Sequence, residues 1–160
     1  MLLKILNIER VDYFSKMRLD DFLLRINNLS DRNSSKLGYD ISGKLFSHNR
    51  FRFSKRFKLF GAEIKSIESD LSYVNGKVIE DNGLNIKVWI RPNAVFSIFG
   101  ILFSVVGIIA FIDYFFNSAS VESVIVGILF ILIGPICYLI GKEQREKLKK
   151  QFESYFNLNN

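Results

Sequence analysis

The chain has 160 residues, a length that allows one soluble domain of about 90 residues together with a membrane hairpin. Its formal net charge is +6, and Cys137 is its single cysteine, which excludes a disulfide framework and a cysteine-based zinc site. Beside a membrane, the simplest partner for the excess positive charge is the anionic inner leaflet, and nucleic acid is a less favoured one.

The first predicted elements are a strand over residues 5–13 and an amphipathic helix over residues 16–28, with Ser15 as the helix cap. Apolar side chains recur on one face of this helix at helical spacing: Leu19, Phe22, Leu23 and Ile26. The opposite face carries charges of both signs, which favours packing on a sheet over lying on a membrane. Residues 29–38 are expected to form a loop.

Period-two alternation predicts the next strands and a candidate binding face. After a strand over residues 41–46 and a turn at residues 47–49, basic and apolar side chains alternate, and the basic ones are Arg50, Arg52, Arg56 and Lys58. We expect this basic face to bind anionic lipid head groups. The alternatives are a merely solvated sheet face and a site for an anionic ligand, such as a nucleotide or an RNA. Stacking partners for bases are less evident, because Phe51 and Phe53 point to the other face.

Two further strands, over residues 71–80 and 84–91, are joined at residues 81–83, where Asp-Asn-Gly is a strong hairpin signal. Gly76 is expected to mark a bulge in the first of them. The second alternates between an apolar face and Lys87, Trp89 and Arg91, and it leads directly into Pro92, which suits the start of a helix. The soluble domain is therefore expected to lie against the inner leaflet.

Two apolar runs, residues 93–112 and 123–141, contain no Asp, Glu, Lys, Arg or His. Each is about as long as the roughly 20 residues that cross a bilayer as a helix. We predict a transmembrane hairpin over residues 92–141, with spans at residues 93–113 and 121–141. The alternative is a soluble protein with the hairpin in its core, which is disfavoured because a core helix needs a polar face.

The distribution of basic residues predicts the topology. Of the 22 lysines and arginines, 17 lie in residues 1–91 and 5 lie in residues 142–160, so the gap at residues 113–122 has none. Basic residues near membrane ends are retained on the cytoplasmic side. We therefore expect a multi-pass protein of the bacterial cytoplasmic (inner) membrane with both termini in the cytosol.

Small residues form a stripe on each apolar helix, and helices in a bilayer associate through such stripes. The glycines among them are Gly100, Gly107, Gly127, Gly134 and Gly141. We expect the two stripes to hold the hairpin to itself, and the alternative is that one stripe faces a second copy in a homo-oligomer. After the hairpin, residues 142–160 are predicted to form a basic, amphipathic cytosolic tail, which either lies among the head groups or continues the second span.

Taken together, these elements predict an α+β membrane protein: a cytosolic domain over residues 1–91, built from a small antiparallel sheet and one amphipathic helix, followed by the hairpin and the tail. The chain resembles a set of small uncharacterised bacterial membrane proteins with an N-terminal β-rich domain and a C-terminal hairpin. The residues that match that pattern are Gly43-Lys44-Leu45, Phe51-Arg52-Phe53, Gly76-Lys77-Val78 and Pro92-Asn93 with Phe96. The stretch between Phe53 and Gly76 is longer than the pattern expects, and the resemblance implies an architecture without a function.

No catalytic, metal or cofactor motif is recognisable. His48, the single histidine, lies in a predicted turn, and a solvated residue is the favoured interpretation over a general base. The apolar runs contain no charge for ion coupling. We therefore expect no enzyme and no cofactor, but a membrane-anchored binding or scaffold module that oligomerises. The alternative is a ligand-triggered effector, in which the sheet senses an anionic small molecule and the hairpins assemble to perturb the membrane.

Overall fold

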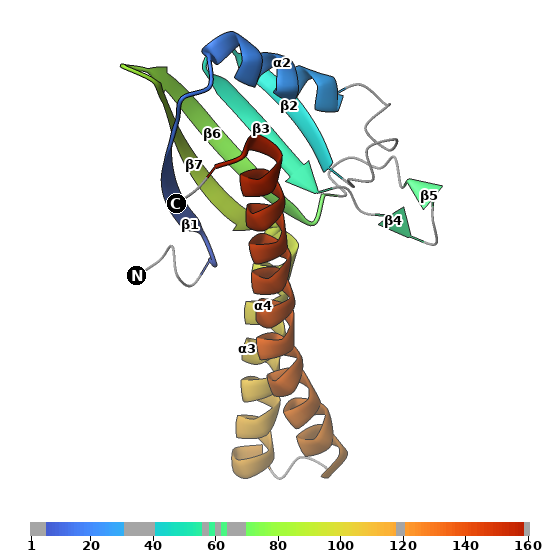
Figure 1. The fold of residues 1–160 in the computed structure, drawn as a ribbon. Coiled ribbons are helices and arrows are strands. Elements are labelled where there is room, and N and C mark those ends of the chain that lie inside the picture. Colours follow the sequence, from blue (N-terminus) through green and yellow to red (C-terminus); the bar gives the residue numbers. More distant parts are fainter. Residues whose placement is uncertain are drawn as a thin grey trace.

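The computed structural model describes residues 6–30, 41–55, 58–59, 62–63, 70–117 and 121–158. It consists of an antiparallel five-stranded sheet with helices on one face and two long helices that extend away from the sheet as a hairpin (Figure 1). The strand order is β1-β7-β6-β3-β2. The predicted α+β layout is therefore present.

The N-terminal elements are β1 (Glu9–Ser15) and α2 (Leu19–Ser30), so both begin later than the sequence predicts. Ser15 ends the strand, and its hydroxyl accepts a hydrogen bond from the Met17 N–H at 3.2 Å instead of capping the helix directly. Phe22 and Ile26 of α2 are fully buried against the sheet, as their spacing predicts. Leu29, expected at the start of a loop, is also fully buried because the helix continues to Ser30, and residues 31–38 of that expected loop lie outside the described residues.

The next strands are β2 (Ile41–Ser47) and β3 (Arg50–Lys55), with a register shift between Leu45 and Ser47. The expected basic strand does not continue beyond Lys55 in this sheet. Lys58 instead belongs to β4 (Lys58–Leu59), which pairs with β5 (Ala62–Glu63) in a separate two-stranded sheet.

The strands β6 (Ser72–Glu80) and β7 (Leu84–Pro92) form the predicted hairpin. Its turn needs Asn82 and Gly83 at positive φ, of 51° and 138°, which Asn and Gly adopt most readily. The expected bulge at Gly76 is wrong, because pairing with β7 runs through Gly76↔Val88 without a shift. A Cβ on Gly76 would instead overlap the ring of Phe51, so this position is small because a neighbouring strand places a ring over it.

One face of the sheet is covered by α2 and by the C-terminal part of α4 (Val121–Phe156), as Figure 1 shows. Leu148 and Phe152 on α4 are fully buried. The Phe152 ring lies 5.3 Å from the Phe53 ring between centroids, and Phe156 lies 4.6 Å from Phe22 of α2. The tail thus continues the second apolar helix without a break, and its apolar face is buried against the sheet and not among lipid head groups.

Pro92, expected to start the helix, is instead the last residue of β7, where it pairs with Ser72, and Asn93 alone separates it from the hairpin. Asn93 caps α3 (Ala94–Asn117), because its side-chain oxygen accepts a hydrogen bond from the Val95 N–H at 3.1 Å. The Asn93 side chain also donates to the Asp70 carbonyl at 2.8 Å, and its backbone N–H donates to the Leu71 carbonyl at 2.9 Å. These bonds fix the end of the sheet to the start of the hairpin.

The glycines of α3 and α4 lie where the two helices meet. A Cβ on Gly107 would lie 2.7 Å from the Gly127 carbonyl oxygen, and one on Gly100 would lie 3.1 Å from the Gly134 carbonyl oxygen. At the sheet end, a Cβ on Gly141 would lie 3.1 Å from Phe96 Cβ. Both small-residue stripes therefore face each other inside one hairpin.

Both helices of the hairpin are long and apolar enough to cross a membrane, over Ala94–Tyr114 and Val124–Phe156. Only 17% of the most apolar part of each is buried inside the protein. The hydrophobic core of the described residues lies between the sheet, α2 and the end of α4, and not within the hairpin.

Candidate functional site

The face of the sheet opposite α2 and α4 carries most of its basic side chains. Antiparallel pairing aligns one row across all five strands, in the order Arg10, Trp89, Asn75, Arg52 and Lys44. Side chains aligned in this way lie on the same face and are close enough to interact. This open basic face is the candidate functional site.

A second row runs parallel to the first, one step further from the hairpin. Arg50 pairs with Lys77, Lys77 with Lys87, and Lys87 with Asp12. Like charges directly opposite one another destabilise a sheet. Within the described residues, Asp12 is the one carboxylate in these two rows, so the face has an excess of positive charge.

Aromatic rings lie among these cations. The Arg10 guanidinium is 5.5 Å from the centroid of the Trp89 ring system, and Arg52 is 5.2 Å from both the Phe46 and the Tyr73 ring centroids. Arg52 also donates from Nε to the Asn75 side-chain oxygen at 2.8 Å. The rings and this hydrogen bond hold the guanidinium groups in place, which reduces the entropy lost when they bind a ligand.

A shallow cavity of about 550 Å³ opens on this face. Its lining comes from β2, β3, β6 and β7: Phe46, Arg50, Phe51, Arg52, Asn75, Gly76, Lys77 and Trp89. A hollow lined by both cations and aromatic rings can take a ligand that has both a charged and a flat apolar part.

The structure brings together two of the four basic residues expected to form a binding face, Arg50 and Arg52. Arg56 lies outside the described residues, and Lys58 lies in the separate β4–β5 sheet. Sequence reasoning did not connect these two arginines with Arg10, Lys77 or Trp89. The alternation within each strand indicates which of its residues lie on the same face. Predicting which residues of different strands lie side by side also requires the order and register of the strands, which the local sequence does not give.

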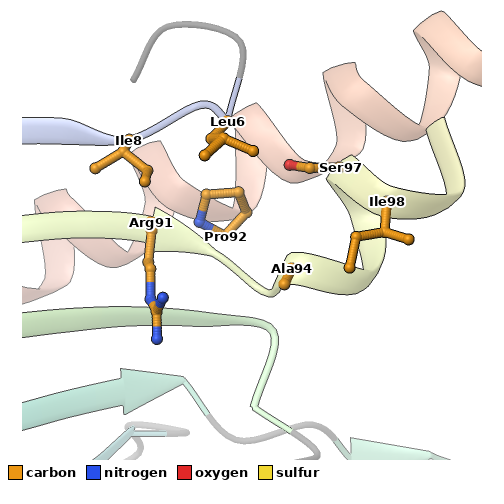
Figure 2. Close-up of a pocket in the computed structure, with 7 residues that line it drawn as sticks. All are labelled: Leu6, Ile8, Arg91, Pro92, Ala94, Ser97 and Ile98. Atoms are coloured by element: carbon orange, nitrogen blue, oxygen red, sulfur yellow. The ribbon is translucent and has the colours of Figure 1, made fainter. Parts of the chain in front are cut away.

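A second cavity, of about 160 Å³, lies where the sheet meets α3. Figure 2 shows Leu6, Ile8 and Pro92 facing one another, with Ser97 beyond them, while Arg91 points away. Of the residues that line this junction cavity, Arg91 and Ser97 are polar, and the others are apolar.

A charged seam joins β1 to the end of α4. Glu9 contacts Lys149 at 2.6 Å and Arg145 at 3.4 Å, and the Tyr13 hydroxyl donates to Glu153 at 2.7 Å. The hydrogen bond to Glu9 raises the pKa of Lys149, whereas burial, followed by the hydrogen bond to Glu153, raises the pKa of Tyr13. The seam is structural, because it fixes the last turns of α4 to the edge strand.

Among the described residues, no group of three or more His, Cys, Asp or Glu side chains is placed to hold a metal ion. His48 is exposed in the β2–β3 turn. Comparisons with protein-family models, with curated proteins and with solved structures find no match to this chain.

Proposed function

We propose that this protein is a non-enzymatic, membrane-anchored binding module. In this proposal α3 and α4 span the bacterial cytoplasmic membrane, both termini lie in the cytosol, and the open basic face binds an anionic ligand. The observation that supports it best is the contrast between two exposed surfaces. The hairpin exposes apolar side chains along its whole length, while the uncovered face of the sheet is strongly basic.

An exposed apolar hairpin is too costly in water for a protein that is otherwise well packed. At about 25 cal/mol per Å² of apolar surface, covering both helices with lipid is worth tens of kcal/mol. The absence of lysine and arginine between the helices favours the orientation in which the sheet is cytosolic.

The topology is tested with reporters. A reporter fused after Asn160 is expected to be cytosolic, and one inserted at Ser118 is expected to be outside. Resistance of the full-length protein to carbonate extraction is the matching test of the anchor. A C-terminal reporter on the outside, or release into the soluble fraction, would contradict the proposal.

A ligand-triggered effector is the second candidate, and the continuity of α4 favours it. One helix runs from the proposed membrane span into the core of the sheet domain, so a change at the sheet can reach the hairpin without a flexible linker. Assembly into a homo-oligomer would use the large side chains on the outer faces, because the small-residue stripes are occupied within the hairpin.

The two candidates differ in the response of the host cell. An effector is expected to depolarise the membrane when its ligand is supplied, and a Gly-Gly insertion after Glu143 should abolish this by interrupting α4. A binding module leaves the membrane potential unchanged with and without the insertion.

A further inference from the structure

We propose that the cavity on the open basic face binds a nucleotide, with the base stacked on Trp89 and the phosphates held by Arg50, Arg52 and Lys77. This rests on the proposed function, because it names the class of anionic ligand for the same face. The cavity volume of about 550 Å³ falls in the range of pockets that take small molecules.

The phosphate end of the site follows from unneutralised charge. Arg50 and Lys77 are direct cross-strand neighbours, and both line the cavity. No carboxylate of the described residues pairs with either. Two facing cations repel one another, and a phosphate placed between them replaces that repulsion with charge-assisted hydrogen bonds. The guanidinium of Arg50 offers the bidentate geometry that phosphate oxygens accept.

The base end follows from the rings. Trp89 is half-buried, with Arg10 beside it on one strand and Asn75 on the other. Phe46, which is 53% exposed, lines the opposite side of the cavity from Trp89, on β2 and beside Arg52. Any base has a flat π face, and stacking it on an aromatic side chain is a general means of holding nucleotides. The side-chain amide of Asn75, held through its oxygen by Arg52, lies between the two ends with N–H donors for the base edge.

The position of the cavity favours a soluble ligand over a lipid head group. Along β7, Trp89 and Lys87 come three and five residues before Pro92, which is roughly 10 and 17 Å of strand. The head-group layer of one leaflet is only about 5–8 Å thick. Lipid phosphates are therefore expected to contact Arg91, in the row nearest the hairpin. A cavity lined by aromatic rings fits a small soluble molecule better than it fits a flat membrane surface.

Trp89 is the only tryptophan of the chain, so its fluorescence reports on this site alone. Full-length protein in discs of zwitterionic lipid is titrated with ATP, GTP, CTP and UTP. We expect saturable quenching by at least one of them. Inorganic triphosphate should compete with that nucleotide without quenching, and the matching nucleoside should bind at least tenfold more weakly, since it lacks the phosphates.

Variants separate the two ends. Arg50→Ala and Lys77→Ala are each expected to weaken nucleotide binding about tenfold or more, the usual effect of losing a charged hydrogen bond. Arg18→Ala, which removes an exposed arginine on the covered side of the sheet, is the matched control and should bind normally. Circular dichroism of each variant checks that it is folded.

Three outcomes would overturn the proposal. They are absence of quenching by all four nucleotides, equal binding of inorganic triphosphate and nucleotide, and quenching only by anionic vesicles or by an RNA oligonucleotide. The last two leave the proposed anion-binding function in place. Failure of the membrane anchor is detected separately, by the reporters and the carbonate extraction.

Discussion

Large aromatic rings fill the interior of the sheet domain, where Phe152 lies 5.3 Å from Phe53 and 6.0 Å from Tyr13 between centroids. By contrast, α3 and α4 approach most closely at glycines, and one ring pair, Phe103 and Phe130, stacks between them at 5.4 Å. In water, burying large apolar surfaces drives folding, and bulky rings give the greatest gain. Between lipid tails that gain disappears, so helices associate by close backbone approach. One helix, α4, takes part in both kinds of packing: its first half approaches α3 at glycines, and its last turns pack rings against the sheet.

The largest expected effect is at the centre of the sheet core. Phe152→Ala leaves a cavity among the rings and should lower the free energy of unfolding by about 3–5 kcal/mol. Thermal unfolding in detergent, followed by circular dichroism, measures it. Phe116→Ala is the control, because Phe116, in the hairpin, is 81% exposed. If both variants lost the same stability, large rings would not be more important in the sheet core than in the hairpin.

A large side chain at the interface between α3 and α4 should also destabilise the protein, but by overfilling an interface instead of leaving a cavity. A Cβ on Gly134 would already lie 2.8 Å from the Gly100 carbonyl oxygen, so Gly134→Leu forces the helices apart. We expect a loss of roughly 1–3 kcal/mol and poor expression. Normal expression together with the loss of a crosslinked oligomer would show that this stripe serves a second copy.

The seam between β1 and α4 predicts a loss of stability at high pH. Tyr13 has its pKa raised above the usual 10.0, so above that pH the unfolded chain releases a proton that the folded chain keeps. The free energy of unfolding then falls by about 1.4 kcal/mol per pH unit, until the folded tyrosine also ionises. The raised pKa of Lys149 acts in the same direction.

Melting temperatures between pH 9 and pH 11 measure this dependence. Tyr13→Phe should be less stable than the natural protein near neutral pH, because it lacks the hydrogen bond to Glu153, but its stability should fall less steeply with pH. Identical slopes for the two proteins would show that Tyr13 does not cause the alkaline loss.

The smallest effect is expected on the outer face of the hairpin. Leu132 is 56% exposed. It is close in sequence to the residues at the interface between α3 and α4, but its own side chain does not fill that interface. Leu132→Ala should change the free energy of unfolding by less than about 0.5 kcal/mol, as surface substitutions usually do. A loss comparable with that of Gly134→Leu would show that the outer face packs against protein, and chemical crosslinking would then identify the neighbour.

The sequence predicted the parts of the fold that have a local signal. The hairpin around Asn82 and Gly83 and the apolar helices are read directly from turn chemistry and from the absence of charge. The tail shows why the rest could not be predicted. Leu148, Phe152 and Phe156 form one apolar helical face. A helix that packs on a sheet and a helix that lies on a membrane surface have the same pattern, so the sequence does not show which of the two surfaces covers this face.

The candidate site was predicted only in part for a related reason. Arg50 and Arg52 stand out within one strand, while Trp89 and Lys77 join them through pairing between strands that lie far apart in the sequence. The same is true of Gly76, whose small size is explained by the Phe51 ring of a neighbouring strand and by nothing in its own.

The order of elements along the chain has a consequence for biosynthesis. The five strands and α2 leave the ribosome before the hairpin, and the turns of α4 that carry Leu148 and Phe152 follow only after it. Until the hairpin has formed and the chain has returned to the sheet, Phe152 does not cover the rings of Phe51 and Phe53. A copy whose hairpin fails to form therefore exposes an apolar surface of the kind that chaperones and proteases act on, so maturation of the sheet domain depends on the hairpin being made correctly.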